Sequence, residues 1–155
     1  MSRLLRVLTG RRRHSDRLVG TSRDGVVTSD HVQVGRRTHL ATRVGLLVEG
    51  GVVIGKRCSI VADGRIGAGS VLSNRVRFTG AGTVELEGDN WVGTGATLVA
   101  PVTLRRGAVV APGTVVTGVV PAMTIAAGDP GRVIGSRFSN DVIREHEDAR
   151  LPVGS

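Results

Sequence analysis

The sequence predicts an all-β fold in which short strands wind into a solenoid of triangular coils. An apolar residue recurs at about every sixth position from Val34 to about Pro121. Four residues after each of them comes a small residue or valine, and only Asn90 departs from that rule. Because each unit makes one strand and one tight turn, three units make a coil, and the fourteen units here make nearly five coils. The recurring apolar residues are Val34, Leu40, Val48, Ile54, Ile60, Ile66, Leu72, Phe78, Leu86, Val92, Leu98, Leu104, Val110 and Val116.

The composition fits a solenoid better than an ordinary globular core. The 155 residues include no Tyr, one Trp and two Phe, against 23 Gly. Large aromatic side chains usually dominate a globular core. A solenoid instead fills a narrow interior with aliphatic and small side chains and bends at its glycines. We therefore expect a single domain, whose β-solenoid spans residues 26–121.

The repeat breaks twice, and the two breaks are related. Leu40 to Val48 and Phe78 to Leu86 are each eight residues apart instead of six. The breaks lie 38 residues apart, which is two coils plus the two extra residues. This spacing predicts that both bulges leave the solenoid at the same corner of the triangle.

Residues 1–25 form a basic N-terminal arm with seven Arg and two Asp, which is much of the net charge of +8. One interpretation is a solvated arm or a short helix that covers the first coil. The other is an anchor for a surface of anionic lipid or for a nucleic acid. The absence of aromatic stacking residues disfavours nucleic acid as the partner.

Residues 122–155 lie beyond the repeat. The glycines and Pro130 in residues 122–135 predict an exit loop. A helix is expected to begin near Ser139 or Asn140, either of which could cap it. It would cover the last coil, because an uncovered end exposes unpaired strand edges.

The single cysteine, Cys58, falls in the small-residue positions of the repeat and predicts a buried thiol. It has no partner for an internal disulfide and no companions for a metal site, so we expect no metal. A reducing cytoplasm is the expected location. No run of about 18 apolar residues predicts a transmembrane helix, and no signal peptide is evident.

Several stretches resemble a known family. Residues 88–93 read GDNWVG, similar to the GDNVWIG of sugar O-acetyltransferases with one valine absent. Residues 107–117 read GAVVAPGTVVT, similar to GAVIGAGSVVT, and residues 126–134 read AAGDPGRVI, similar to AGNPAKVI. These motifs resemble those of the hexapeptide-repeat acyltransferases, closest to the sugar O-acetyltransferase branch. The resemblance implies a left-handed parallel β-helix, a homotrimer, and acyl-CoA as co-substrate without a tightly bound cofactor.

The resemblance also implies where acyl-CoA lies, along the outside of the coils between two subunits. By position it points to Trp91 and Gly93, to Ala111 and Thr117, and to Arg132, whose guanidinium suits a phosphate. Packing at a trimer interface is an alternative role for Trp91, and an ordinary surface charge is the alternative for Arg132.

The catalytic histidine of this family has no counterpart at either familiar position. In the sugar branch it lies on a loop ahead of the tryptophan motif, where this chain has Ala81. In the serine acetyltransferase branch it precedes a GVVIG motif, which residues 51–55 reproduce, but the matching residue is Val48. Such a histidine removes the proton of the attacking acceptor.

Three residues remain as candidates for a relocated base: His39, His31 and Glu87. Glu85 and Asp89 flank Glu87 and share its carboxylate chemistry. A carboxylate is a weak base at neutral pH unless burial raises its pKa. The related γ-class carbonic anhydrases need three histidines around zinc, and His31 and His39 do not reproduce that spacing.

Two functions follow as hypotheses. The first is an acyl-CoA-dependent O- or N-acyltransferase, acting on a sugar or another small hydroxyl or amine in a cleft at a subunit interface. Positioning two substrates supplies much of the rate without a base. The second is a catalytically degenerate paralogue that serves as a trimeric scaffold or a CoA-ligand binding module. The basic arm leaves open an association with an anionic membrane surface.

Overall fold

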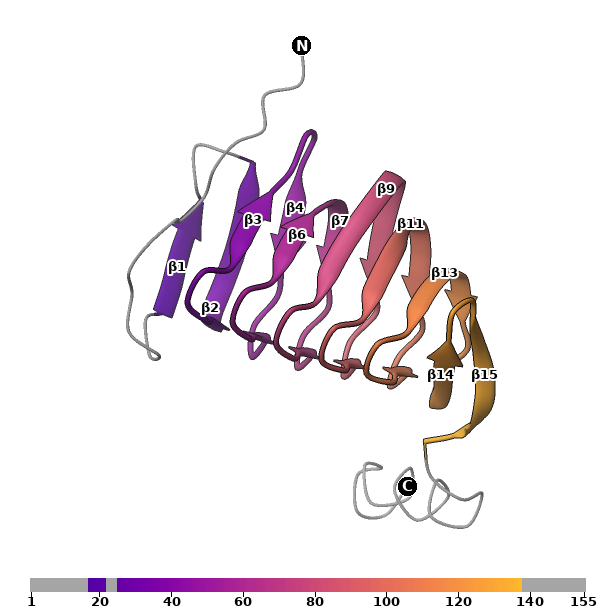
Figure 1. Cartoon of the computed structure of the whole chain (residues 1–155). Coiled ribbons are helices and arrows are strands. Elements are labelled where there is room, and N and C mark those ends of the chain that lie inside the picture. Colours follow the sequence, from indigo (N-terminus) through magenta and orange to yellow (C-terminus); the bar gives the residue numbers. More distant parts are fainter. Residues whose placement is uncertain (1–16, 22–24, 138–155) are drawn as a thin grey trace, which may run out of the picture.

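The computed structural model describes residues 17–21 and 25–137, and every regular element in that part of the chain is a β-strand (Figure 1). Parallel strands wind into a triangular solenoid, as the repeat predicts. The strands are β1 (Arg17–Thr21), β2 (Val26–Val34), β3 (His39–Ala41), β4 (Leu46–Val48), β5 (Val53–Ile54), β6 (Ser59–Val61), β7 (Asp63–Ile66), β8 (Val71–Leu72), β9 (Arg77–Leu86), β10 (Trp91–Val92), β11 (Thr97–Leu104), β12 (Val109–Val110), β13 (Val115–Val120), β14 (Thr124–Gly128) and β15 (Gly131–Ser136).

The strands form three faces. Face 1 stacks the start of β2, then β4, β7 and the ends of β9, β11 and β13. Face 2 stacks the end of β2, then β5, β8, β10, β12 and β14. Face 3 stacks β3, β6 and the starts of β9, β11 and β13. We name each corner by the faces it joins, so corner 2–3 connects face 2 to face 3.

The solenoid is longer than the repeat predicted. Faces 1 and 2 each have six parallel strands in register, whereas face 3 has five. The repeat from Val34 to Pro121 missed a strand at each end. At the start, the position of Thr28 beside Val48 holds no large apolar residue. At the other end, β14 continues face 2 through residues for which the sequence predicted a loop.

The register confirms that both frame breaks lie at one corner, corner 3–1. Successive coils differ in length there, while the pairing along faces 2 and 3 stays regular. The last coil is shortened, so Val120 lies beside Leu104 in the large apolar row and not in the small-residue row where the repeat put it. The pairs that fix the coil lengths at 20, 18, 20, 18 and 16 residues are Val26–Leu46, Leu46–Gly64, Gly64–Val84, Val84–Val102 and Val102–Gly118.

The inward side chains form one continuous core along the solenoid axis. Phe78 is the largest fully buried side chain, and the rest are mostly Leu, Ile and Val. Each such side chain contributes about 1.5–3 kcal/mol on burial. The exception in the repeat, Asn90, is buried but satisfied. Its Oδ1 accepts the N–H of Gly88 at 3.0 Å, and its Nδ2 donates to the carbonyl of Arg105 at 2.7 Å.

Both ends of the described solenoid carry antiparallel strands. β1 pairs with β2 at the first coil, so part of the expected basic arm is a strand. β14 and β15 form a hairpin over the last coil, so the expected exit loop at 122–135 is wrong for residues 124–128 and 131–135, which are strands. These residues extend because β14 finds a parallel partner in β12. The expected helix from Ser139 lies outside the described residues, as do residues 1–16.

Candidate functional site

Corner 2–3 is built from tight turns that repeat in every coil. We call the coils toward the C-terminal end of the solenoid the upper coils. Where the first residue of a turn is Gly35, Gly55 or Gly93, it packs against the next coil up, and a Cβ on Gly93 would lie 2.5 Å from the backbone nitrogen of Pro112. Ser73 and Ala111 hold the same position in the other two turns. The third residue has a left-handed backbone, with φ of 74° at Gly95 and 70° at Gly113. These upper turns therefore present backbone and small side chains to solvent, in a smooth strip.

Four of the predicted ligand-binding residues lie on this side of the upper coils. Trp91 on β10 stays 39% exposed between Val71 and Val109, two residues before Gly93. Gly93 lies next to the chain of Ala111, since its N–H donates to the carbonyl of Val110 at 2.7 Å.

Arg132 lies at the upper end of the same side. It is exposed on β15, where it pairs with Ala127 of β14. The residue before it, Gly131, packs closely on Thr114 and Val115 of the last coil. A guanidinium thus stands above the strip of small turns.

Thr117 is not part of this group. It follows Val116 past face 3, and its hydroxyl donates to the carbonyl of Pro101 at 3.2 Å. It therefore lies at corner 3–1, on the far side of face 3 from corner 2–3. Within one chain, Thr117 and Gly93 do not line the same surface.

The two described histidine candidates are far from the strip. His39 is half-buried on face 3 and pairs in series with Ser59, Arg77 and then Thr97. Three steps between coils place it roughly 14 Å below the coil of Trp91 along the axis. His31 lies in the same first coil, at corner 1–2, with an exposed side chain and a φ of 63°.

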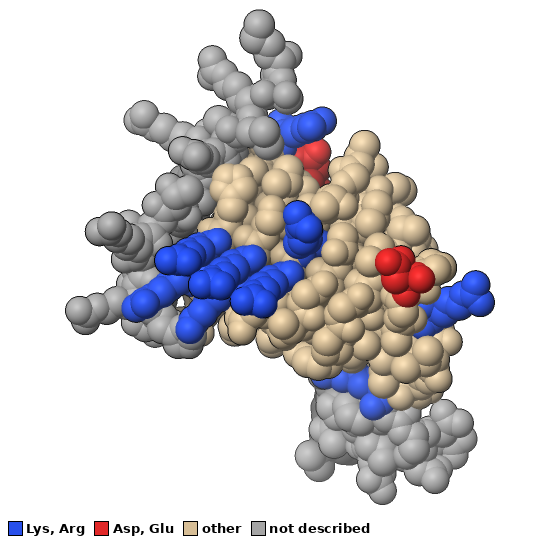
Figure 2. Space-filling model, viewed as in Figure 1, with Lys and Arg blue, Asp and Glu red and all other residues tan. Residues whose placement is uncertain are grey.

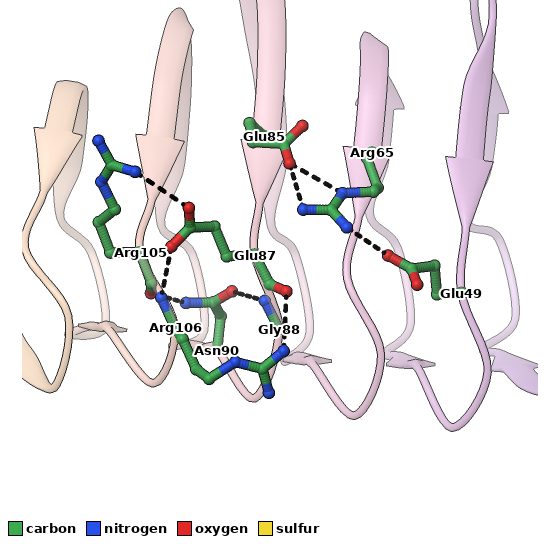
Figure 3. Close-up of polar contacts among 8 residues, drawn as sticks. All are labelled: Glu49, Arg65, Glu85, Glu87, Gly88, Asn90, Arg105 and Arg106. Carbon is green, nitrogen blue, oxygen red and sulfur yellow. Dashed lines mark hydrogen bonds and ion pairs between the residues drawn. The ribbon is translucent and has the colours of Figure 1, made fainter.

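Glu87 belongs to a network of ion pairs beside corner 1–2 (Figure 3). Its Oε2 accepts from Nη1 of Arg105 at 3.1 Å, and its Oε1 accepts the backbone N–H of Arg106 at 3.1 Å. On face 1, Arg65 bridges the carboxylates of Glu85 and Glu49. Both carboxylate oxygens of Glu87 are therefore engaged by neighbouring groups of its own chain.

The bulges at corner 3–1 enclose a shallow pocket of about 100 Å³. Ala81 lines it, so the residue at the expected histidine position faces this pocket. Desolvation opposes the charge of Asp63 in this pocket. Hydrogen bonds from the Thr42 hydroxyl and from the N–H groups of Val44 and Arg43 outweigh it and lower the pKa of Asp63. The pocket therefore holds a fixed carboxylate and no imidazole, and repeat reasoning alone did not single out Asp63.

Other predicted positions are structural. Val48 is fully buried and cannot meet a substrate. Cys58 is buried, and desolvation raises the pKa of its thiol. Within residues 17–21 and 25–137, no three metal-ligating side chains gather in one place. No helix there has the length and apolar character needed to cross a membrane.

Comparison with curated proteins finds acetyltransferases. The chain is 41% identical over 69 residues to a 2,3,4,5-tetrahydropyridine-2,6-dicarboxylate N-acetyltransferase of Staphylococcus aureus, covering 44% of this chain and 29% of the relative. It is 33% identical over 106 residues to a serine acetyltransferase of Bacillus licheniformis, covering 66% and 48%. The chain thus spans between about a third and a half of these relatives. No family model matches it.

Solved structures share the fold. A hexapeptide-repeat acetyltransferase of Vibrio cholerae, complexed with acetyl-CoA, superposes with a TM-score of 0.66 at 20% identity, covering 74% of this chain and 72% of that one. A maltose O-acetyltransferase of Clostridium difficile superposes with a TM-score of 0.63 at 21% identity, covering 72% and 69%. These likenesses confirm the left-handed β-helix. Together with the curated relatives, they confirm the resemblance to hexapeptide-repeat acetyltransferases.

Proposed function

We propose that this chain, whose relatives are hexapeptide-repeat acetyltransferases, is an acyl-CoA-dependent O- or N-acyltransferase. The observation that carries the proposal is the strip of small turns at corner 2–3, with Trp91 beside it and Arg132 above it. A strip of backbone and small side chains lets an extended thiol arm lie against backbone amides. An exposed guanidinium near its end suits the phosphates of CoA.

The acceptor in this proposal is a sugar or another small molecule with a hydroxyl or amine. Binding both substrates in one cleft replaces a bimolecular encounter with a positioned one. The acceptor oxygen or nitrogen attacks the thioester carbonyl carbon and forms the new ester or amide bond as the C–S bond breaks. The acceptor's proton passes to solvent, and the CoA thiolate leaves and takes up a proton to become the free thiol. Positioning alone would make acyl transfer on the wild-type protein much faster than the uncatalysed reaction between acyl-CoA and the acceptor in solution.

The assembly in this proposal is a homotrimer in the cytoplasm, with each cleft formed by two subunits. Thr117 supports that arrangement, because it lies at a different corner from Gly93 and Ala111 and would reach acyl-CoA only from a neighbouring chain. His39 and His31 lie three coils below Trp91 and are too far from it to act within one chain. Light scattering after gel filtration measures the mass, and a monomer would exclude the shared cleft.

A second function is favoured by a specific observation. Ala81 lines the pocket where the resemblance implies a histidine, and Val48 is buried at the other familiar position. A chain that kept the acyl-CoA strip and lost its base would be a CoA-ligand binding module or a trimeric scaffold.

The experiment that separates these functions measures thiol release from acetyl-CoA against a panel of sugars, amino sugars and amino acids. Thermal-shift titration with CoA runs alongside on the same protein. An acyltransferase releases thiol faster when its acceptor is present. Stabilisation by CoA without turnover would support the binding module, and the absence of both would exclude an acyl-CoA site.

A further inference from the structure

The lower turns of corner 2–3 carry cations where the upper turns carry small residues. All of these cations are exposed. Figure 2 shows Lys and Arg side chains gathered side by side over the first coils of the solenoid. We name this group the basic ladder: Arg36, Arg37, Lys56, Arg57, Arg75 and, on the adjoining face 3, Arg77.

The ladder is not neutralised by the described side chains. Their four ion pairs involve only Arg65, Arg105 and Arg106 as cations. The acids in those pairs lie on face 1 and at corner 1–2, away from the ladder. Asp63, at corner 3–1, is occupied by Thr42 and nearby backbone N–H groups.

Packing does not require arginine in the ladder. Arg37, Arg57 and Arg75 have φ values of 58°, 56° and 58°, a left-handed backbone that favours glycine. The equivalent residues of the upper coils are Gly95 and Gly113, where a Cβ would meet nothing within 4 Å. The turn therefore accepts either residue, and the lower coils hold three arginines in an unfavourable conformation.

The β-helix stacks the backbones of these residues at the distance between coils, about 4.8 Å, so their charged side chains extend from neighbouring positions. Like charges in neighbouring positions repel one another, so the ladder lowers the stability of the fold. An anionic surface bound to the ladder would neutralise these charges and remove that cost. We propose that the basic ladder docks the protein onto an anionic phospholipid bilayer. This surface is separate from the acyl-CoA strip, and the proposal does not depend on the enzymatic activity.

A bilayer fits the ladder better than a nucleic acid does. The exposed aromatic of the described solenoid, Trp91, lies on face 2 in the coil above Arg75, so the ladder itself offers no aromatic ring on which a base could stack. The sequence that precedes the first coil adds charge and apolar residues together. Residues 1–16 contain five Arg and one Asp, with Leu4, Leu5, Val7 and Leu8 among them, a composition typical of segments that bind lipid surfaces.

The test is sedimentation of the full-length chain with vesicles of equal parts phosphatidylcholine and phosphatidylglycerol. The variant Arg37→Gly/Arg57→Gly/Arg75→Gly removes three cations and installs the residue that the upper turns already use, so its fold is preserved. We expect its partition coefficient to fall by about 10- to 100-fold. Wild-type binding should weaken steeply with added salt and be absent on phosphatidylcholine alone.

The matched control is Arg65→Gln/Arg105→Gln/Arg106→Gln, which removes the same charge from paired sites elsewhere. Its binding should fall by no more than about threefold, after a circular dichroism melt has shown that it is folded. An equal loss of vesicle binding in both triple variants would overturn the proposal, because binding would then depend on the net charge of the protein and not on the ladder. Unchanged binding of the glycine variant would assign docking to residues 1–16, and tighter binding to duplex DNA than to vesicles at equal salt would also overturn it.

Discussion

The upper and lower turns of corner 2–3 share a backbone and differ in chemistry. Their first residues are constrained alike, since a Cβ on Gly55 would lie 2.7 Å from the backbone of Ser73, as one on Gly93 would meet Pro112. Their third residues differ completely, arginine below and glycine above, at nearly the same φ. Coil packing therefore constrains the first position at Gly55 and Gly93, although the turns that begin at Ser73 and Ala111 accommodate a Cβ there, and it leaves the third position available for binding.

The largest effect on stability should come from substitutions at the first position of the turns, where Gly93 and Gly55 pack on the next coil. Gly93→Ala and Gly55→Ala should each lower the free energy of unfolding by about 2–3 kcal/mol, because the new Cβ overlaps backbone of the next coil. Urea denaturation measures the loss. The control is Gly135→Ala, where a Cβ would meet nothing within 4 Å. Wild-type stability in both turn variants would show that the coils separate readily and that packing does not fix this position.

CoA binding tests whether the upper and lower turns of corner 2–3 differ as binding surfaces. Arg132→Gln should weaken CoA binding by about tenfold, or 1.4 kcal/mol, if its guanidinium meets a phosphate. Arg75→Gln removes the same charge from the lower turns and should leave CoA affinity within about twofold. Isothermal titration with CoA measures both. Equal losses would mean that CoA responds to overall charge and would remove Arg132 from the proposed site.

The third position of an upper turn should matter less to stability than the first. Gly95→Ala introduces a side chain into open space, so only the left-handed backbone opposes it. We expect a loss of about 1 kcal/mol in urea denaturation. A loss as large as that of Gly93→Ala would contradict the distinction between packed and outward positions.

The six-residue repeat predicted the features that packing of the interior determines. It did not predict the strands that depend on pairing with a neighbouring strand. The period from Val34 to Val116 fixed the faces, the inward residues and the common corner of both bulges, because each inward residue must fill the same narrow interior. It missed the strand of Thr28, where a half-buried threonine pairs with Val48 in place of a large apolar residue, and β14, which pairs with β12 on one side and with β15 on the other. Local sequence carries no signal for such pairing.

The site was less predictable than the fold, for the same reason. Motifs brought Trp91, Gly93 and Arg132 to one side, since they follow the coil period. They did not reveal that Thr117 lies at another corner, although the repeat itself implies it, because Gly93 and Thr117 are four six-residue units apart, which is one coil and one further face. Nor could they reveal the ladder, because Arg37, Arg57 and Arg75 become neighbours only through coils of 20 and 18 residues (Arg37 to Arg57 and Arg57 to Arg75).

Corner 3–1 supplies a fixed carboxylate that should respond to acid. The folded pKa of Asp63 lies below its unfolded value, so its contribution is fully present above about pH 4 and is lost as pH falls through the folded pKa. Asp63→Asn should lower stability at neutral pH by no more than about 1 kcal/mol and flatten the acid side of the profile. Urea denaturation across pH measures this, and parallel profiles for variant and wild type would exclude Asp63 as the cause.

The smallest effect should be that of a single ladder residue on stability. Arg57→Gly relieves a left-handed backbone, worth about 1–2 kcal/mol, but it frees the unfolded chain, which costs about 0.5–1 kcal/mol. The net result should be an increase of about 0.5 kcal/mol in the free energy of unfolding of the variant. It should shrink in high salt, because salt screens the repulsion among the ladder cations in the wild type more than in the variant. Urea denaturation at two salt concentrations measures it, and a variant clearly less stable than wild type would mean that Arg57 stabilises the coil and is not held there against its conformational preference.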